Sequence, residues 1–492
     1  MEQKDINNIK LTDSQENVLK KILDFVNNSN DRVFILKGYA GTGKTTLMRF
    51  LIKALNEKEK KYRLLASTGR AAKVLANLSG NPLGASTIHS LIYSFRGFNR
   101  DTEGEDEKDV DRNGQELFLV FQPATLDEKT EPETIYIIDE ASMVSDVAPK
   151  DIKQAQFGDG RLLKNLLDYD RRPGSKFIFV GDPCQLPPIE EYYSPALMEE
   201  YIRDILGLGS QEAQLTEIMR QKGVSGIVNA SKQIRELYET APADILHYGR
   251  QKVWGYLPFR GNNDIVLHAQ AEDMINHYVG KIKANGLNSA VCICRSNKAC
   301  GQLSTVIRQK LGYTDYRIAV GDLLLVTQNN LAVGLMNGDM VTVEEISSHT
   351  QTRARLTFRQ MKVKELFTQK TYTSLLIEEI AYQGKINLDK AQQQALFVDF
   401  VIRMKKKGIT EKNNRMAFYQ AMENDPYLNA LRCVFGYAIT CHKSQGGEWE
   451  DVYVHMPRNI TFNPVKETYQ WVYTAMTRAS KTLHAVDEFY IK

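Results

Sequence analysis

The stretch VFILKGYAGTGKTTL, residues 33–47, runs from an apolar segment into a glycine-rich turn that ends in a lysine and two threonines. It fits the phosphate-loop pattern G-x-x-x-x-G-K-[ST], with Lys44 and Thr45 at its last two positions. Residues 33–36 predict a strand and residues 46–55 a helix, and this context favours a phosphate loop over a glycine-rich turn without a ligand. We expect the nucleotide to be held here by Gly38, Gly41, Gly43, Lys44, Thr45 and Thr46.

Each residue type in this turn suits a bound phosphate. Glycines let backbone N–H groups curl around phosphate oxygens, and the helix that follows presents its positive N-terminus. Lys44 adds a charge at the β and γ phosphates, and Thr45 can ligate Mg²⁺.

A second predicted strand supplies the acidic groups that a phosphate loop needs. The segment TIYIIDE, residues 134–140, is an apolar run that ends in Asp139 and Glu140. We expect Asp139 to hold Mg²⁺ together with Thr45, and Glu140 to orient or deprotonate the attacking water. An acidic pair at the end of any buried strand is the alternative, but the phosphate loop upstream favours a nucleoside triphosphate hydrolase.

A third strand, in the segment FIFVGDPCQLPPI at residues 177–189, carries Asp182 and Gln185 at its end. In a parallel sheet its polar groups reach the same crevice as the phosphate loop. Gln185 suits sensing of the γ-phosphate or its water. A proline-rich turn after a buried strand accounts for Pro187 and Pro188, but it does not account for the polar residues before them.

The composition limits the class of protein. At 492 residues the chain is long enough for two to four domains, and its net charge of +3 neither requires nor excludes a polyanionic partner. Six scattered cysteines favour a reducing compartment, and their spacing lacks the fourth ligand of a zinc site. No stretch approaches the ~20 apolar residues of a membrane span, so we expect a soluble, cytoplasmic protein without a membrane partner.

Taken in order along the chain, these blocks resemble a superfamily 1 helicase of the 5′→3′ branch, close to RecD-like helicases and Dda-type phage helicases. Pif-type helicases share the loop GYAGTGKTT and the run QLPPI, so the subfamily stays open, although the short segment before residue 11 favours the Dda type. The other blocks that carry the resemblance are LTDSQ (11–15), LLASTGRAAKVL (64–75), ASTIHSL (85–91), LTEIMRQ (215–221), YAITCHKSQGGE (437–448) and WVYTAMTRA (471–479).

The resemblance implies roles for the residues in these blocks. Gln15 is expected to pair with the purine edge of ATP, and Glu448 to contact the nucleotide. The expected catalytic set is Lys44, Glu140, Gln185, Arg220 and Arg478, with the two arginines reaching the γ-phosphate from a second domain that closes over it.

Single-stranded DNA is expected to bind at hydroxyl-rich segments, whose contacts to a sugar-phosphate backbone position the strand without reading its sequence. The expected contacts are Thr68, Lys73, Ser86, Thr87, His89, Thr440, His442, Lys443 and Ser444. The alternative for the hydroxyls is helix capping, with Ser86 or Thr87 opening the helix at His89. An ordinary loop histidine is the alternative for His442.

The alternation of apolar strands and amphipathic helices predicts an α/β fold. The resemblance implies two RecA-like parallel-sheet motor domains, the first at residues 1–205 and the second at residues 206–320 and 432–492. A β-hairpin insertion is expected in the first, at about residues 93–133. An SH3-like β-barrel insertion with a helical extension is expected in the second, at residues 321–431.

The second insertion is flanked by residues 290–296 and 432–440, which we predict as strands of the second motor domain. Its later part, residues 387–431, predicts two helices. The basic run VIRMKKKGITEKNNR, residues 401–415, is interpreted as a solvated helix end rather than as a site for DNA or a partner.

The hairpin insertion has an acidic tip, residues 101–111, which should repel phosphate. Its aromatic residues Phe95, Phe98, Phe118 and Phe121 can stack on bases or form a small core within the hairpin. We favour the core for Phe118 and Phe121.

Two functions from different classes remain at this point. The first is an ATP- and Mg²⁺-dependent DNA helicase that acts as a monomer on single-stranded and forked or tailed duplex DNA, with single-strand-binding or replication and repair proteins as partners. The second is a phosphate-loop switch or loader whose nucleotide state controls a partner protein. The two distant arginines and the hydroxyl-rich segments favour the helicase. A translocase that strips proteins from DNA is an intermediate case that only the hairpin distinguishes.

Overall fold

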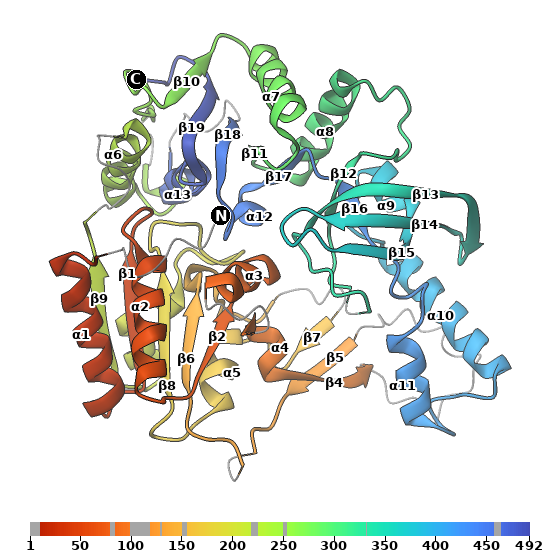
Figure 1. The fold of residues 1–492 in the computed structure, drawn as a ribbon, viewed down its shortest axis with the longest axis horizontal. Helices are drawn as coiled ribbons and strands as arrows, with labels where there is room; N and C mark the ends of the chain where they lie inside the picture. Colours follow the sequence, from red (N-terminus) through yellow and green to blue (C-terminus); the bar gives the residue numbers. More distant parts are fainter. Residues whose placement is uncertain are drawn as a thin grey trace.

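The computed structural model of the chain describes residues 10–78, 84–98, 119–127, 130–149, 155–217, 225–248, 253–330, 332–456 and 464–492. Two parallel sheets lie one above the other in Figure 1, and an antiparallel sheet lies beside them. The mixed α/β fold with parallel sheets is therefore confirmed. None of the helices in the described ranges is long and apolar enough to cross a membrane.

The first sheet has six parallel strands in the order β3-β2-β6-β8-β1-β9. Its strands are β1 (Val33–Gly38), β2 (Tyr62–Ala66), β3 (Ala85–Thr87), β6 (Ile135–Asp139), β8 (Lys176–Gly181) and β9 (Ser210–Leu215). Its helices are α1 (Asp13–Asn28), α2 (Lys44–Glu57), α3 (Gly69–Leu78), α4 (Ile88–Ile92) and α5 (Leu162–Tyr169).

The apolar run of β1 is buried on both faces of this sheet because successive side chains of a strand point in opposite directions. Val33 and Ile35 pack in one apolar cluster with residues of α5. Phe34 and Leu36 pack in another with residues of α1 and α2. The carboxyl ends of β1, β6 and β8 consequently meet at one edge of the sheet.

The second sheet is also parallel, in the order β10-β19-β18-β11-β17. Its strands are β10 (Ile265–His268), β11 (Ala290–Cys294), β17 (Ala438–Thr440), β18 (Trp449–His455) and β19 (Ala479–Val486). Its helices are α6 (Gly226–Thr240), α7 (Ala271–Asn285), α8 (Asn297–Leu311), α12 (Cys441–Ser444) and α13 (Lys466–Met476). The connection from β10 through α7 to β11 and the connection from β18 through α13 to β19 step across the sheet in opposite directions, so right-handed crossovers put these two helices on opposite faces.

The third sheet is antiparallel, in the order β15-β14-β13-β12-β16. Its strands are β12 (Leu323–Val326), β13 (Met340–Arg353), β14 (Leu356–Glu365), β15 (Thr371–Ile377) and β16 (Cys433–Phe435). The prediction of one strand over residues 432–440 is wrong, because β16 pairs with β12 in this sheet and only β17 joins the parallel sheet. The chain changes sheets at Gly436, where an added Cβ would lie 3.1 Å from the backbone of Leu324.

Smaller elements complete the described fold. The strands β4 (Tyr93–Phe98) and β5 (Leu119–Pro123) pair antiparallel, and β7 (Ala155–Phe157) runs parallel to β5. After β15 come α9 (Glu378–Gln383), α10 (Lys390–Lys406) and α11 (Arg415–Glu423), which confirms the two helices predicted over residues 387–431. The acidic segment 101–111 and Phe118 lie outside the described residues.

Candidate nucleotide site at the junction of two parallel sheets

The phosphate loop connects the end of β1 to the start of α2. Gly43 caps α2 with a φ of 80°, in the left-handed region that favours glycine. An added Cβ at Gly38 would lie 2.8 Å from Thr42 Oγ1, so the tight turn needs glycine there as well. Lys44 Nζ donates to the carbonyl oxygens of Gly38 at 2.6 Å and Tyr39 at 3.1 Å, which points the ammonium group into the loop. The other expected loop residues, Gly41, Thr45 and Thr46, lie in the same turn and in the first turn of α2.

The two expected acids lie at the end of β6. Glu140 has a φ of 51°, a left-handed conformation that is strained for a side chain other than glycine and is often found at functional sites. Its backbone N–H donates to Asp139 Oδ1 at 2.9 Å. Burial and the neighbouring Glu140 carboxylate raise the pKa of Asp139, and the charge of Lys44 acts in the opposite direction. The phosphate-loop lysine and the acidic pair therefore share one site.

The segment after β8 closes the same edge. Asp182 Oδ1 accepts from Cys184 N at 3.0 Å, and Gln185 N donates to Asp182 O at 3.2 Å, which holds a tight turn. Gln185 is buried, and its side-chain Oε1 has no hydrogen-bond partner among the described residues. An unpaired buried acceptor is costly, which suits a site that a ligand or its water completes.

Helix α13 of the second sheet contacts this edge of the first sheet directly. The Tyr473 hydroxyl accepts from Ala40 N–H in the phosphate loop at 3.0 Å and donates to Asp182 Oδ2 at 2.8 Å. Thr474, the next residue of α13, accepts at Oγ1 from Leu186 N at 2.8 Å. Tyr473 is fully buried. Its single hydroxyl therefore connects the phosphate loop, the segment after β8 and the second sheet within the protein interior.

Two glutamines extend this junction. Gln470 Nε2 donates to Gln185 O at 3.3 Å, and Gln445 Nε2 donates to Leu186 O at 3.2 Å. Gln445 is buried and its Oε1 has no partner among the described residues. The residues Gln470, Tyr473 and Thr474 were not among the predicted site residues, whereas Gln445 belongs to the hydroxyl-rich block that was expected to contact the DNA backbone. The only signal of the other three in the sequence is their place inside or beside the block at residues 471–479.

The remaining expected nucleotide contacts lie around this junction. Gln15, on α1, donates from Nε2 to Thr42 O in the phosphate loop at 3.2 Å. Arg478 is buried directly after α13, and its Nε donates to Thr474 O at 3.0 Å. Glu448 is exposed. Arg220 lies outside the described residues.

The hydroxyl-rich segments are explained in part by local structure. Thr87 caps α4 by accepting from Ser90 N at 3.2 Å, so the capping alternative is confirmed for it, and Thr68 accepts from Ala71 N in the same way. The Ser444 hydroxyl is fully buried and donates to the carbonyl oxygen of Cys441 at 2.7 Å, so its proton is used within α12. Four further residues that were expected to contact DNA are partly buried, namely Ser86, Thr440, His442 and Lys443.

Two other expected DNA contacts have protein partners. Lys73 Nζ, on α3, lies 2.6 Å from Asp339 Oδ2, which belongs to the turn before β13. The ring of His89 packs 5.0 Å from that of Phe157, and burial lowers the pKa of His89 to about 4. The aromatic packing explains the buried position of His89 without a DNA ligand. The ion pair of Lys73 with Asp339 instead connects a helix of the first sheet to the antiparallel sheet.

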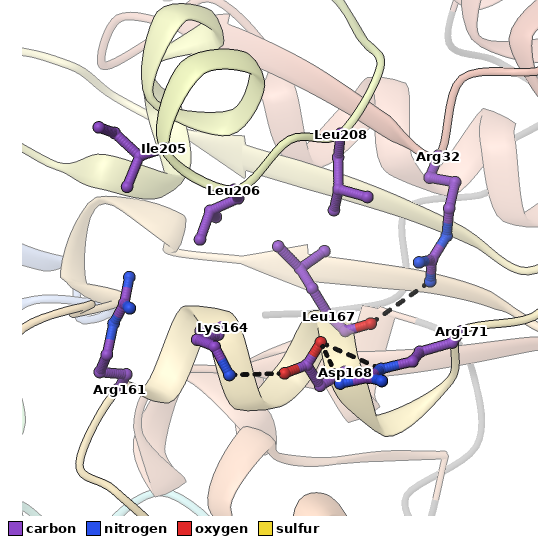
Figure 2. Close-up of a pocket in the computed structure, with 9 residues that line it drawn as sticks. All are labelled: Arg32, Arg161, Lys164, Leu167, Asp168, Arg171, Ile205, Leu206 and Leu208. Atoms are coloured by element: carbon purple, nitrogen blue, oxygen red, sulfur yellow. Dashed lines mark hydrogen bonds and ion pairs between the residues drawn. The ribbon is translucent and has the colours of Figure 1, made fainter.

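A pocket of about 270 Å³ lies elsewhere on the first sheet, and Figure 2 shows its lining. Arg32 precedes β1, so this pocket lies at the amino ends of the strands, opposite the phosphate loop. Lys164 and Arg171 both pair with Asp168, at 2.8 and 3.1 Å. Because ligands of parallel α/β sheets bind at the carboxyl ends, the phosphate-loop edge is the better candidate site.

Two protein-family models match the chain. The model described as "AAA domain" matches residues 10–251, and the "UvrD-like helicase C-terminal domain" matches residues 435–486. The first match contains the phosphate loop and the segments after β6 and β8. The second contains α12, α13 and Arg478.

Individual proteins match over almost the whole chain. The ATP-dependent DNA helicase dda of Enterobacteria phage T4 is 23% identical over 511 residues, covering 98% of this chain and 99% of that protein. The uncharacterized protein MJ1519 of Methanocaldococcus jannaschii is 24% identical over 494 residues, covering 95% of this chain but only 37% of that protein. A crystal structure of a Bacteroides Pif1 helicase with ADP-AlF3 and ssDNA has a TM-score of 0.47 and 17% identity, covering 98% of this chain and 93% of that one. The helicase model and the dda match confirm the resemblance to superfamily 1 helicases.

Proposed function

We infer that this relative of the superfamily 1 helicases is an ATP-dependent DNA helicase, which hydrolyses ATP between its two parallel sheets and moves 5′→3′ on single-stranded DNA to unwind duplex. The observation that carries the inference is the contact of α13 with the phosphate loop. The Tyr473 hydroxyl binds both the loop and Asp182, so the second sheet reaches the site where the γ-phosphate would lie. When ATP is hydrolysed at such a junction, the contacts of the γ-phosphate that hold the two sheets together are lost.

The groups of the first sheet suit ATP hydrolysis. Lys44 is directed into the loop, and Glu140, next to Asp139, has a strained backbone conformation. Thr45 and Asp139 are the residues that would hold Mg²⁺, a cation that prefers oxygen ligands and few carboxylates. When bound, Mg²⁺ offsets the negative charge that develops on the phosphate oxygens. Glu140 then orients the attacking water and accepts its proton.

Arg478, at the junction, is suited to stabilise the transferred phosphoryl group. Arg478 is buried beside α13, and its guanidinium donates to the neutral oxygens of Thr474, Gly447 and Thr477 within the described part of the chain. A buried cation without a carboxylate partner among its described contacts favours an anionic ligand. We assign Arg478 and Arg220 to the γ-phosphate, and Gln185 to its attacking water.

The domain organisation follows the sheets. We propose a first RecA-like motor domain that runs from residue 1 through β9, and a second that takes up the rest of the chain to residue 320 and resumes after the inserted SH3-like domain. The boundary expected at residue 205 is too early, because β9 pairs with β1 in the first sheet. The segment β16 lies in the inserted sheet, so the return to the second motor domain falls at Gly436 rather than at residue 432.

Single-stranded DNA is proposed to run across both motor domains, along α3, the start of α4 and α12. These three segments carry the half-buried polar groups Thr68, Lys73, Ser86, Thr440 and His442. Their spread over two sheets means that a change at the nucleotide changes the distance between DNA contacts, which is what a translocating motor requires.

The hairpin of β4 and β5 is proposed as the element that separates the strands. Phe95 packs against Phe121 at a ring distance of 5.4 Å and against Tyr419 of α11 at 5.3 Å. Arg415 of α11 donates to the carbonyl oxygen of Arg96 at 3.5 Å. Helix α11 of the second insertion therefore holds the hairpin from outside, and a wedge must be held rigidly to split base pairs. Its aromatic rings serve this packing.

The test is steady-state ATP hydrolysis with and without a single-stranded oligonucleotide at two salt concentrations. We expect stimulation by DNA that weakens as salt rises, because phosphate contacts release counterions. Duplexes with a 5′ or a 3′ tail then report direction, with Glu140→Gln as the inactive control. Hydrolysis that ignores DNA would instead support the switch, and stimulation without unwinding of either duplex would support a translocase.

A further inference from the structure

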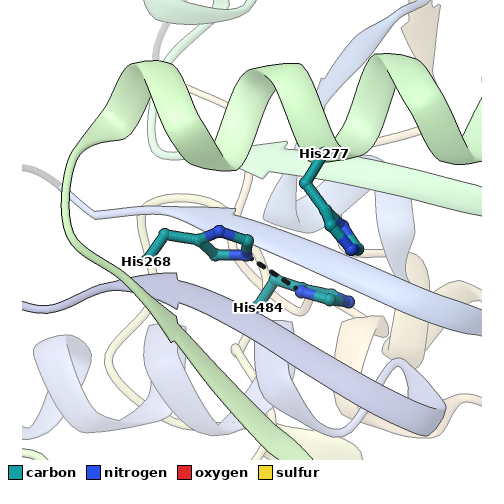
Figure 3. Close-up of side chains that lie close together, drawn as sticks. All are labelled: His268, His277 and His484. Carbon is teal, nitrogen blue, oxygen red and sulfur yellow. Dashed lines mark hydrogen bonds between the residues drawn. The ribbon is translucent and has the colours of Figure 1, made fainter.

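Three histidines from separate segments meet on the second sheet. His268 ends β10, His277 lies on α7, and His484 lies on β19, and Figure 3 shows their rings turned toward one another. Their candidate ligand nitrogens all lie within 4.8 Å of one another. His268 Nε2 and His484 Nδ1 are 3.1 Å apart. None of the three belongs to the nucleotide or DNA residues assigned above.

The cluster lies on the face of the second sheet that α7 covers, whereas α13 and the phosphate loop lie on the other side. His277 reaches Tyr453 of β18, which stacks on His484 at a ring distance of 4.1 Å and an interplanar angle of 4°. This separation from the cleft means that helicase function does not account for the cluster.

Each of two rings has an outer partner that fixes which nitrogen carries the proton. His484 Nε2 is 3.2 Å from Asp451 Oδ1, whose other oxygen pairs with Lys281 at 2.7 Å. A carboxylate only accepts, so His484 carries its proton on Nε2 and turns the lone pair of Nδ1 toward His268. His277 Nδ1 is 2.8 Å from the Tyr453 hydroxyl, which can accept the proton of Nδ1 and leave Nε2 as a ligand.

We propose that His268, His277 and His484 bind one Zn²⁺, with Asp451 and Tyr453 as the outer groups that orient two of the ligands. Imidazole suits Zn²⁺, and metal-bound histidines typically donate their other N–H to a carboxylate or a similar acceptor. Zinc–nitrogen bonds of about 2.0–2.1 Å in a tetrahedron put two ligand nitrogens about 3.4 Å apart. The separation of 3.1 Å between His268 and His484 is close to that value.

The third ligand completes the site by a side-chain movement. His277 is exposed, so its ring can rotate closer than the 4.8 Å limit without disturbing the core. The fourth position would hold water. The bound ion would tie the edge strand β10 to β19 and α7, and so stabilise the second sheet without touching the cleft.

The experiment uses the full chain, without an affinity tag and stripped with a chelator. Titration with Co²⁺ should give the visible absorption of a tetrahedral site that saturates at one equivalent, and Zn²⁺ should displace it. The main variant is His277→Ala, because an exposed side chain can be removed without unfolding the chain. We expect its Zn²⁺ affinity to fall by more than about 100-fold, since loss of an outer group alone costs about 10–100-fold.

The control is His349→Ala, an exposed histidine on β13 that should leave the titration unchanged. Asp451→Asn should keep one equivalent and weaken it by about 10–100-fold. Zn²⁺ should raise the thermal midpoint of the wild type and not of His277→Ala, with DNA-stimulated ATPase equal in both. No saturable absorption, or equal affinity in wild type and His277→Ala, would mean an adventitious ion only and would overturn the assignment.

Discussion

Replacing Tyr473 with phenylalanine tests whether the contact of α13 with the phosphate loop sets the rate of ATP hydrolysis. The substitution keeps the buried ring and removes only the hydroxyl. That hydroxyl accepts from Ala40 N–H at 3.0 Å and donates to Asp182 Oδ2 at 2.8 Å. Both contacts join the second sheet to the first, so Tyr473→Phe weakens the docked arrangement specifically.

The size of the effect follows from these two hydrogen bonds. A bond to a carboxylate contributes about 1.5–3 kcal/mol and one between neutral groups about 0.5–1.5 kcal/mol. Because Tyr473 is 1% exposed, water does not readily replace either bond. The docked arrangement should therefore lose about 2–4.5 kcal/mol, which is a factor of about 30 to 2,000 at 1.36 kcal/mol per tenfold change. Since docking brings Arg478 to the site, we expect kcat to fall at least tenfold.

Tyr278→Phe is the matched control. Tyr278 is buried in the same domain, and its hydroxyl donates to Tyr437 O at 2.9 Å, away from the cleft. Both variants should lose stability in a denaturant titration, but only Tyr473→Phe should lose kcat for ATP at saturating single-stranded DNA. Equal turnover in the two variants would refute the idea that this hydroxyl holds the catalytic arrangement together.

Three further substitutions test the other roles. Lys44→Ala should lose nearly all ATP turnover because the β and γ phosphates lose a positioned charge, and near-normal turnover would remove the lysine from the site. Glu140→Gln should still bind ATP and DNA but hydrolyse about 10²–10⁴-fold more slowly in single-turnover assays, and an unchanged rate would mean that the water is activated elsewhere. Asp339→Asn should release Lys73 and steepen the salt dependence of single-stranded DNA binding by about 0.7 in log–log slope, the value for one more phosphate contact. The double variant with Lys73→Ala should return to the wild-type slope, and a slope unaffected by Asp339→Asn would show that Lys73 does not reach DNA.

The sequence was most informative where the chemistry is local. The run at residues 33–36 and the glycines after it predict a strand and a phosphate loop because both depend on neighbouring residues alone. The hydroxyl-rich segments were less informative, since a threonine that caps a helix and one that binds phosphate look the same in sequence. Thr87 caps α4, and nothing in the sequence separates it from Ser86.

Contacts between distant segments could not be predicted in this way. Tyr473 and Ala40 are 433 residues apart, and Lys73 and Asp339 are 266 residues apart. No spacing rule connects such pairs, because the sheets that bring them together form only in the folded chain. The split of residues 432–440 between two sheets was missed for the same reason: both halves are apolar and β-prone, and only their partners β12 and β11 distinguish them.

Helix α3 gives the physical route by which DNA binding can reach the nucleotide. Its Arg70 stacks on Trp449 of β18, with the guanidinium 4.3 Å from the ring centre. Burial lowers the pKa of Arg70 to about 10, while Asp339 of the inserted sheet raises it and Arg478 lowers it. Arg70 thus lies within electrostatic reach of both the inserted sheet and the arginine assigned to the γ-phosphate. A DNA phosphate that competes for Lys73 would change the charge around Asp339, and Arg70 would carry that change toward Arg478. On this reasoning Arg70→Ala should reduce the stimulation of ATP hydrolysis by DNA more than it reduces hydrolysis without DNA, and an equal loss in both would assign Arg70 to packing alone.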